Sequence, residues 1–458
     1  MESSIAVGSE AVCSETVRSR AVSIHRRFSA VLRGVFVLIL LLRQQADADQ
    51  VQFSSSMNPV GSGARASGMG GAFIAVADDA TAASWNPAGL IHLERPEASL
   101  VYSSSFRSHD YHAVDHPELE GRLQRIAASD INFASIAYPL TMFGRNTVVA
   151  LTYQRLYDMN RKADIRFRYD FSPDFIEDRI SFRQNGYLGA FSPAVAVQLT
   201  PELYLGATVN IWSNIFGTCS WRFTEAVSGT GVMFGDDYRE KIIWSEKNTF
   251  SGQNVNIGLL YGLTGSMTAG LVVKTPFTAS VRRTTTLSID STLSPSSGPV
   301  TGSETVKIRM PLSYGVGLAY RHSDRLTVAL DLYRTRWSEY AATDGAGNRT
   351  NPVSSNDLSE GKPKDTNQLR AGVEYLVIGD RVTVPLRAGV FYDPEPGVRK
   401  VDDFFGASLG SGVAYGNTAF DVSYQYRRGS RVSSDIPLAG ITGDISQHSV
   451  MSSLIYHF

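Results

Sequence analysis

The feature that most constrains this chain is an alternation of apolar and polar residues that recurs many times along it. In residues 306–320 the even positions are large and apolar or aromatic, while the odd positions are polar or small. Successive side chains of a β-strand point to opposite faces, so this period of two predicts strands with one apolar and one polar face. A helix would spread both sets around its circumference and would have no apolar face.

Fourteen segments carry this pattern and are predicted strands: 97–107, 131–140, 146–156, 186–199, 202–214, 250–262, 266–290, 304–320, 325–335, 366–378, 382–393, 405–415, 418–428 and 448–458. Single-chain barrels of the bacterial outer membrane have an even number of strands. Pro276 interrupts the ladder of 266–290, so two strands are an alternative there. We predict one long strand that bends, which keeps the count even.

The connections between these segments alternate between short and long. Short ones such as 141–145 and 200–201 are followed by long ones such as 157–185 and 215–249. Outer-membrane barrels have short periplasmic turns and long outer loops, whereas a soluble β-sandwich has no reason to keep this rhythm. The predicted fold class is therefore all-β, a 14-stranded antiparallel transmembrane β-barrel in the bacterial outer membrane, with both mature termini in the periplasm.

Charge and cysteine content narrow the classes of function. The chain has 43 Lys and Arg against 44 Asp and Glu, and a nucleic-acid partner would require a basic excess. Cys13 lies in a segment that we expect to be removed, which leaves Cys219 alone and excludes an intramolecular disulfide. No catalytic constellation is recognisable, so we expect no enzymatic activity, no cofactor and no metal site.

Both ends of the chain carry signals for export and assembly. Arginines precede the apolar run 35–42, and Ala46 and Ala48 supply the small residues of a cleavage site, so residues 1–48 are predicted to be a signal peptide. The run is too short to span about 30 Å of hydrocarbon. Phe458 ends an alternating strand, which resembles the signal that barrel-assembly machinery recognises, and this machinery is an expected partner.

Small residues dominate the segment before the first strand, predicted as residues 49–96. It contains "GARASGMGGAFIAVADDATAASWNPAGL", with Asn86, Pro87 and Ala88 near its end. Small residues permit a chain to pack closely against a barrel wall from inside.

This stretch resembles the N-terminal hatch of the OMPP1/FadL/TodX family of long-chain fatty-acid and aromatic-hydrocarbon transporters. Later segments resemble the family as well, among them "KTPFTASVRR" from Lys274 and "VPLRAGVFYDPEP" from Val384. The resemblance implies a hatch (49–96) that plugs the lumen of a barrel (97–458), with Asn86-Pro87-Ala88 as the hatch motif.

The resemblance also implies passive uptake of hydrophobic compounds, with a long-chain fatty acid or an aromatic hydrocarbon as the ligand. Two other classes of function remain open. One is a subunit of a secretion or surface-assembly complex, as in relatives with a similar segment. The other is a polar pore, which would conduct ions with the hatch in place. Outer-membrane lipid and lipopolysaccharide are expected partners of the outer surface, and the charged connection 157–185 fits contact with lipopolysaccharide or solvated ion pairs.

Two sets of residues are candidates for contact with the ligand or the hatch. The connection 215–249 is rich in apolar residues and fits ligand capture, a small lid that packs on itself, or a continuation of the strands above the membrane. Its candidates for capture are Phe216, Trp221, Phe223, Phe234 and Trp244. Charged residues on the polar faces of strands fit pairing with one another, anchoring of the hatch or binding of a ligand carboxylate; they are Arg370, Glu374, Arg387 and Asp421, together with Arg309 and Asp331.

Overall fold

The computed structural model describes residues 56–58, 61–113, 123–233, 235–292, 296–354, 356–397, 400–433 and 441–458. The predicted signal peptide and its cleavage site lie outside these residues, as does Phe234. In the described part of the chain, no helix is both long and apolar enough to cross a membrane.

Fourteen antiparallel strands form a closed barrel, as predicted. Each pairs with the next in sequence around the ring, and β20 pairs with β1 from Glu97↔His457 onward to close it. The barrel strands are β1 (Glu97–Ala113), β2 (Leu123–Met142), β3 (Arg145–Asp158), β5 (Asp174–Gln198), β6 (Leu203–Trp212), β8 (Asp236–Thr264), β9 (Met267–Lys274), β12 (Ser313–Arg321), β13 (Leu326–Thr335), β16 (Thr366–Ile378), β17 (Val382–Tyr392), β18 (Phe404–Tyr415), β19 (Thr418–Ser433) and β20 (Ile441–His457).

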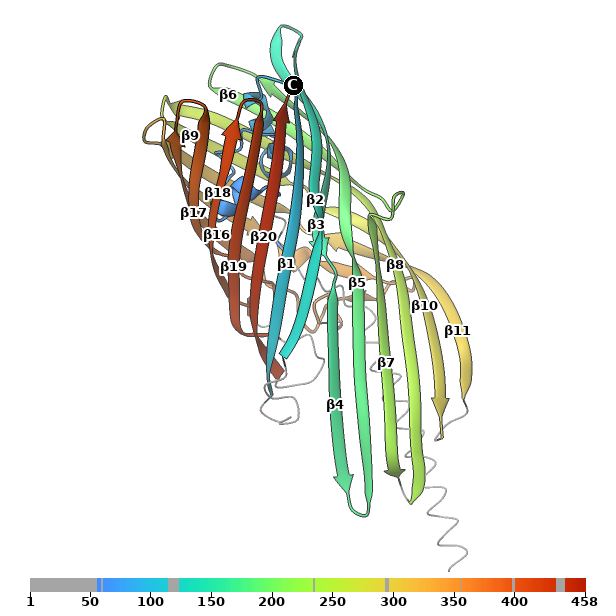
Figure 1. Cartoon of the computed structure of the whole chain (residues 1–458). Helices are drawn as coiled ribbons and strands as arrows, with labels where there is room; N and C mark the ends of the chain where they lie inside the picture. Colours follow the sequence, from blue (N-terminus) through green and yellow to red (C-terminus); the bar gives the residue numbers. More distant parts are fainter. Residues whose placement is uncertain are drawn as a thin grey trace, which may run out of the picture.

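The same sheet continues from one side of the barrel, beyond the end opposite the C-terminus (Figure 1). The long strands β5 and β8 belong to both parts, because their outer halves leave β6 and pair with β7 between them. We call this continuation of the sheet the outer extension. Its other members are β4 (Arg161–Phe171), β7 (Cys219–Met233), β10 (Phe277–Ser291) and β11 (Ser297–Met310), with the short β14 (Ala341–Thr343) and β15 (Arg349–Thr350) along the inner end of β11.

The extension corrects two of the predicted connections. Most of 157–185 is strand, in β4 and the outer half of β5. Most of 215–249 is strand as well, in β7 and the outer half of β8. Both segments therefore continue the strands above the barrel, which was one of the interpretations of 215–249.

Two predicted long strands are each broken in two at a proline. The segment 266–290 forms β9 and β10, with Pro276 between them, and 304–320 forms β11 and β12, with Pro311 between them. Proline has no amide hydrogen to donate to a ladder, so regular pairing ends there. The two breaks lie side by side, because β9 pairs with β12 and β10 pairs with β11. The prediction of one strand in each segment, bent in 266–290, was wrong, although the number of barrel strands is unchanged.

The apolar face reverses between the barrel and the extension. In β12 the apolar side chains, such as Val316, are exposed on the outer wall. In β11 they are buried on the inside, as Val306 and Ile308 are. Strand β8 shows the reversal without a break: Ile242 is buried on the inner side, whereas Ile257 is 45% exposed on the outer side.

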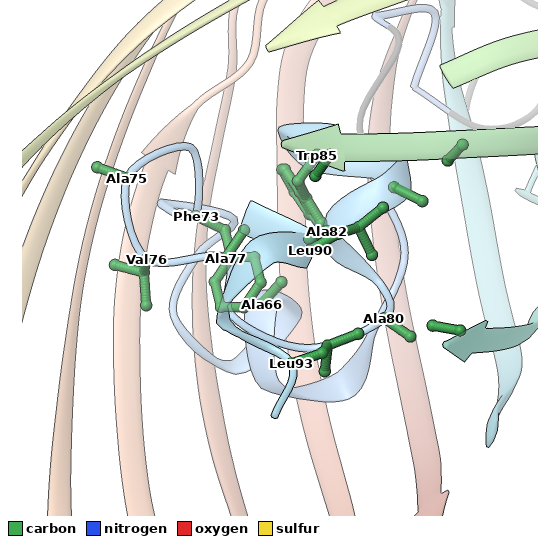
Figure 2. Close-up of a cluster of buried hydrophobic side chains, with 14 of the residues drawn as sticks. Ala66, Phe73, Ala75, Val76, Ala77, Ala80, Ala82, Trp85, Leu90 and Leu93 are labelled. Atoms are coloured by element: carbon green, nitrogen blue, oxygen red, sulfur yellow. The ribbon is translucent and has the colours of Figure 1, made fainter. Parts of the chain in front are cut away.

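Residues 61–96 of the N-terminal segment lie inside the barrel near the end that carries the C-terminus (Figures 1 and 2). It contains the short helices α2 (Ala64–Gly68) and α3 (Ala82–Trp85) and the 3-10 turn η1 (Pro87–His92). Its small residues form one buried cluster with Phe73, Trp85 and Leu90. Alanines of the wall complete this cluster, among them Ala137 of β2 and Ala196 of β5.

Candidate functional site: the barrel lumen

Glycines of the barrel wall permit the N-terminal segment to lie against it. A Cβ on Gly389 of β17 would stand 2.2 Å from the amide nitrogen of Gly70, and one on Gly372 of β16 would stand 2.3 Å from the carbonyl oxygen of Met69. A Cβ on Gly206 of β6 would stand 2.3 Å from the amide nitrogen of Ala88. Backbone therefore packs directly on backbone at these positions, which only glycine permits.

The predicted motif Asn86-Pro87-Ala88 is buried at one of these contacts. The Asn86 side-chain amide donates to the carbonyl oxygen of Ile74 at 2.9 Å and to that of Leu259, on β8, at 3.1 Å. Its Oδ1 accepts from the amide of Ala88 at 3.2 Å and so caps η1. Asn86 thus ties two parts of the segment to each other and to the wall.

The four predicted lumen charges are buried, and three of them form one ionic cluster with the segment. Arg387 donates to Glu374 at 2.6 Å and to Asp421 at 2.5 Å. Arg65 of α2 donates to the two carboxylate oxygens of Glu374 at 3.0 and 2.9 Å. The fourth, Arg370, donates to the carbonyl oxygen of Gly70 at 3.0 Å. The charges of the wall therefore pair with one another and also hold the segment.

Other carboxylates bind the segment through its backbone. Asp331 of β13 accepts from the amides of Phe73 and Ile74 at 2.6 and 2.8 Å. Within the segment, burial and the nearby carboxylate of Glu97 raise the pKa of Asp79 to about 7.

The predicted position of Arg309 was wrong. It was expected in the lumen, but its side chain is 46% exposed on the outer face of β11. The break at Pro311 reverses the two faces there.

A pocket that is partly open to solvent lies between the segment and the extension. Its side toward the segment is polar: Gln154 donates to the hydroxyl of Ser62 at 3.3 Å and the ammonium of Lys274 donates to the carbonyl oxygen of Ser84 at 3.3 Å. Its side toward the extension is apolar and includes Leu156, Tyr157, Trp212, Phe250, Phe277 and Met310. The Trp212 ring stacks on Phe277, with the ring centres 6.1 Å apart. The pocket is thus suited to a molecule with an apolar part and a polar end.

The capture candidates do not form one site. Trp221 of β7 is buried in the apolar cluster that also contains Trp212 and Phe250. Phe223 of β7 and Trp244 of β8 are half-buried on the inner face of the extension, farther from the barrel. Phe216 lies in the turn after β6 and is 73% exposed, and Phe234 lies outside the described residues.

The sequence pattern did not single out the residues that line the pocket. Lys274 and Phe277 lie in the stretch "KTPFTASVRR", which resembles the family. They stand on either side of the break at Pro276, so alternation did not place them together. The wall glycines were also missed, because their partners in the segment are far away along the chain. Phe458, the predicted assembly signal, is 62% exposed, and its amide donates to the carbonyl oxygen of Pro96 at 2.9 Å.

Comparison with known structures shows the same fold in transport proteins. The crystal structure of a Pseudomonas aeruginosa FadL homologue has a TM-score of 0.60 and 15% identity, over 88% of this chain and 100% of that one. The toluene transporter TodX of Pseudomonas putida has a TM-score of 0.53 and 13% identity, over 88% and 100%. The CymD monoaromatic hydrocarbon channel has a TM-score of 0.54 and 17% identity, over 88% and 98%. The comparison with curated protein sequences finds no match.

The family comparison covers most of the chain. The model of the family described as outer membrane protein transport protein (OMPP1/FadL/TodX) matches residues 42–434, from before the N-terminal segment to β19. Together with the closed barrel, the enclosed segment and the lumen pocket, this match shows that the chain belongs to the OMPP1/FadL/TodX family of outer-membrane transport proteins.

Proposed function

We propose that this protein takes up long-chain fatty acids through the lumen pocket. The observation that carries the proposal is the buried ammonium of Lys274 on the polar side of a pocket whose other side is aromatic and apolar. Burial of an alkyl chain contributes about 0.8 kcal/mol per methylene. A cation at one end selects a carboxylate over a hydrocarbon that has no charge.

The shape of the lumen supports this proposal. The inner face of the extension leads toward the pocket with half-buried Phe223 and Trp244 and buried Ile242. In this proposal the ligand reaches the pocket along that face.

The N-terminal segment acts as the hatch in this proposal. The ammonium that faces the ligand also donates to the carbonyl oxygen of Ser84 in the segment. A bound carboxylate competes for this ammonium and so weakens one contact between the segment and the wall. Release requires the segment to move, because its backbone packs directly on the wall glycines.

The proposed orientation places the C-terminal end of the barrel in the periplasm. All the turns at that end are short: 143–144, 199–202, 265–266, 322–325, 379–381 and 416–417. The opposite end carries the outer extension. Short periplasmic turns and longer outer elements are the usual arrangement of outer-membrane barrels. A signal peptide over residues 1–48 and recognition of Phe458 by the assembly machinery belong to the same proposal.

Uptake by a strain that lacks its own transporter tests the proposal. The protein should import labelled oleate, and Lys274→Met should weaken the apparent affinity for oleate by about tenfold or more, because a charge-assisted hydrogen bond is lost. Uptake of toluene should not respond to this change. Lys241→Met, on the outer face of β8, is the matched control.

Three other outcomes would each overturn a different part of the proposal. Import of toluene without oleate would overturn the assignment of a fatty acid. Equal effects of Lys274→Met on both solutes would overturn the role of the ammonium in selecting a carboxylate. No import of either solute by correctly inserted protein would overturn transport of hydrophobic molecules by this chain.

A further inference from the structure

Five exposed cations cross the outer face of the extension, one on each of five neighbouring strands. They are Arg183 of β5, Arg222 of β7, Lys247 of β8, Arg282 of β10 and Lys307 of β11. We call them the basic stripe. On each strand the residue next to the stripe is buried on the inner side, as Gln184, Glu246 and Val306 are, so the stripe faces away from the lumen.

The strand register makes successive members of the stripe direct or diagonal neighbours. Arg222 stands opposite Lys247. Lys247 is diagonal to Arg282, because Arg282 stands opposite Thr249. Arg183 is diagonal to Arg222, because Arg183 stands opposite Thr224. Arg282 is diagonal to Lys307, because Arg282 stands opposite Thr305.

Such neighbours are close enough to repel one another. Direct cross-strand partners have Cβ atoms about 4.5–5.5 Å apart, and diagonal ones about 7–8 Å. Like charges directly opposite each other destabilise a sheet unless an anion lies between them. The register therefore brings together cations that need negative charge from outside the chain.

Farther out on the same face, the chain provides the negative charge itself. Arg168 donates to Asp170 and to Glu177, and Arg179 donates to Asp164. Lys241 of β8 stands opposite Asp290 of β10. Among the described residues, no member of the basic stripe forms an ion pair. The contrast marks the stripe as a surface for an external polyanion.

The position of the stripe indicates which polyanion this is. On the outer face of β8, the exposed apolar side chains Ile257 and Tyr261 belong to the barrel wall. Lys247 lies eight residues before Val255 on the same face, about 26 Å along the strand. The stripe thus lies beyond the band that contacts acyl chains, on the side of the membrane to which the extension projects.

We propose that the basic stripe binds the phosphate groups of lipopolysaccharide in the outer leaflet. This rests on the proposed orientation, which places the extension outside the cell. Guanidinium groups bind phosphate oxygens in pairs, and a row of cations at this spacing matches several phosphates on one lipid or on neighbours. Bound phosphates remove the repulsion within the stripe and hold the extension against the membrane surface.

Binding of purified protein to immobilised lipopolysaccharide, in the presence of a chelator, tests the proposal. The variant Arg222→Gln/Lys247→Gln/Arg282→Gln should bind roughly 100-fold more weakly at low salt, because each of the three cations contributes a similar share of the binding free energy at an anionic surface. The matched control removes three cations that face carboxylates, as Arg168→Gln/Arg179→Gln/Lys241→Gln, and should bind within about threefold of the parent.

Two measurements on the parent protein need no variant. Lipopolysaccharide stripped of its phosphates should bind as weakly as the stripe variant does. Competition by inorganic phosphate at millimolar concentration should be slight, and saturation of the stripe by inorganic phosphate alone would overturn the lipid as the ligand. Equal binding of the parent and the stripe variant would also overturn the proposal.

A measurement of oleate uptake distinguishes a failure of lipopolysaccharide binding by the stripe from a failure of the proposed transport. The stripe faces away from the lumen, so the stripe variant should import oleate into lipid vesicles without lipopolysaccharide as the parent does. Loss of lipopolysaccharide binding with normal uptake supports the stripe. Loss of uptake with normal lipopolysaccharide binding overturns the stripe and leaves the transport pathway as the affected part.

Discussion

The barrel wall and the outer extension use the same alternation in opposite senses. In the wall, apolar residues such as Ile257 face outward and glycines, amides and paired charges face the lumen. In the extension, apolar residues such as Ile242 face inward and charged residues face outward. Because β8 carries both patterns in one unbroken strand, the reversal reflects the surroundings of each half: lipid around the wall and water around the extension.

The largest expected difference between the two regions concerns their ion pairs. Arg387→Met in the wall leaves the buried carboxylates of Glu374 and Asp421 without this partner, which should cost about 3–5 kcal/mol of unfolding free energy. Arg179→Met in the extension removes a solvent-exposed pair with Asp164 and should leave the unfolding free energy nearly unchanged. Urea unfolding from lipid vesicles measures both, and equal losses would contradict a water-exposed extension.

The next difference concerns the outer face of β8 itself. Ile257→Lys places a cation against acyl chains and should destabilise the barrel by about 2–4 kcal/mol. Ser251→Lys, six residues away on the same face, should cost no more than about 1 kcal/mol, because the reversal places it near the membrane surface. The same unfolding measurement applies. A cost at Ser251 that matches the cost at Ile257 would move the boundary of the membrane outward along β8.

The smallest difference concerns glycines. Gly389→Ala in the wall forces its Cβ to within 2.2 Å of Gly70 in the N-terminal segment and should weaken docking of the segment by about 1–3 kcal/mol. Gly302→Ala in the extension meets no atom within 4 Å and should leave docking unchanged. Conductance in planar bilayers, together with protease cleavage of the segment, reports the docking. Unchanged values for Gly389→Ala would show that the segment does not seal the lumen by this contact.

The sequence by itself predicted the strands of the barrel and their number. Period-two alternation depends only on the geometry of a strand, so it was readable without knowledge of any partner. The same reading placed Arg370, Glu374, Arg387 and Asp421 on lumen faces, where the structure buries them. The Asn86-Pro87-Ala88 motif was found by resemblance, and its contacts with Ile74 and Leu259 became visible only in the structure.

Only the tertiary structure decided which face of each alternating segment points inward. Alternation defines two faces but does not say whether the apolar one meets lipid or a protein interior. For this reason 157–185 and 215–249 were predicted as connections, and Arg309 was placed on the wrong side of β11. The pocket, the wall glycines and the basic stripe each join residues from strands far apart in the chain, and strand register brings them together.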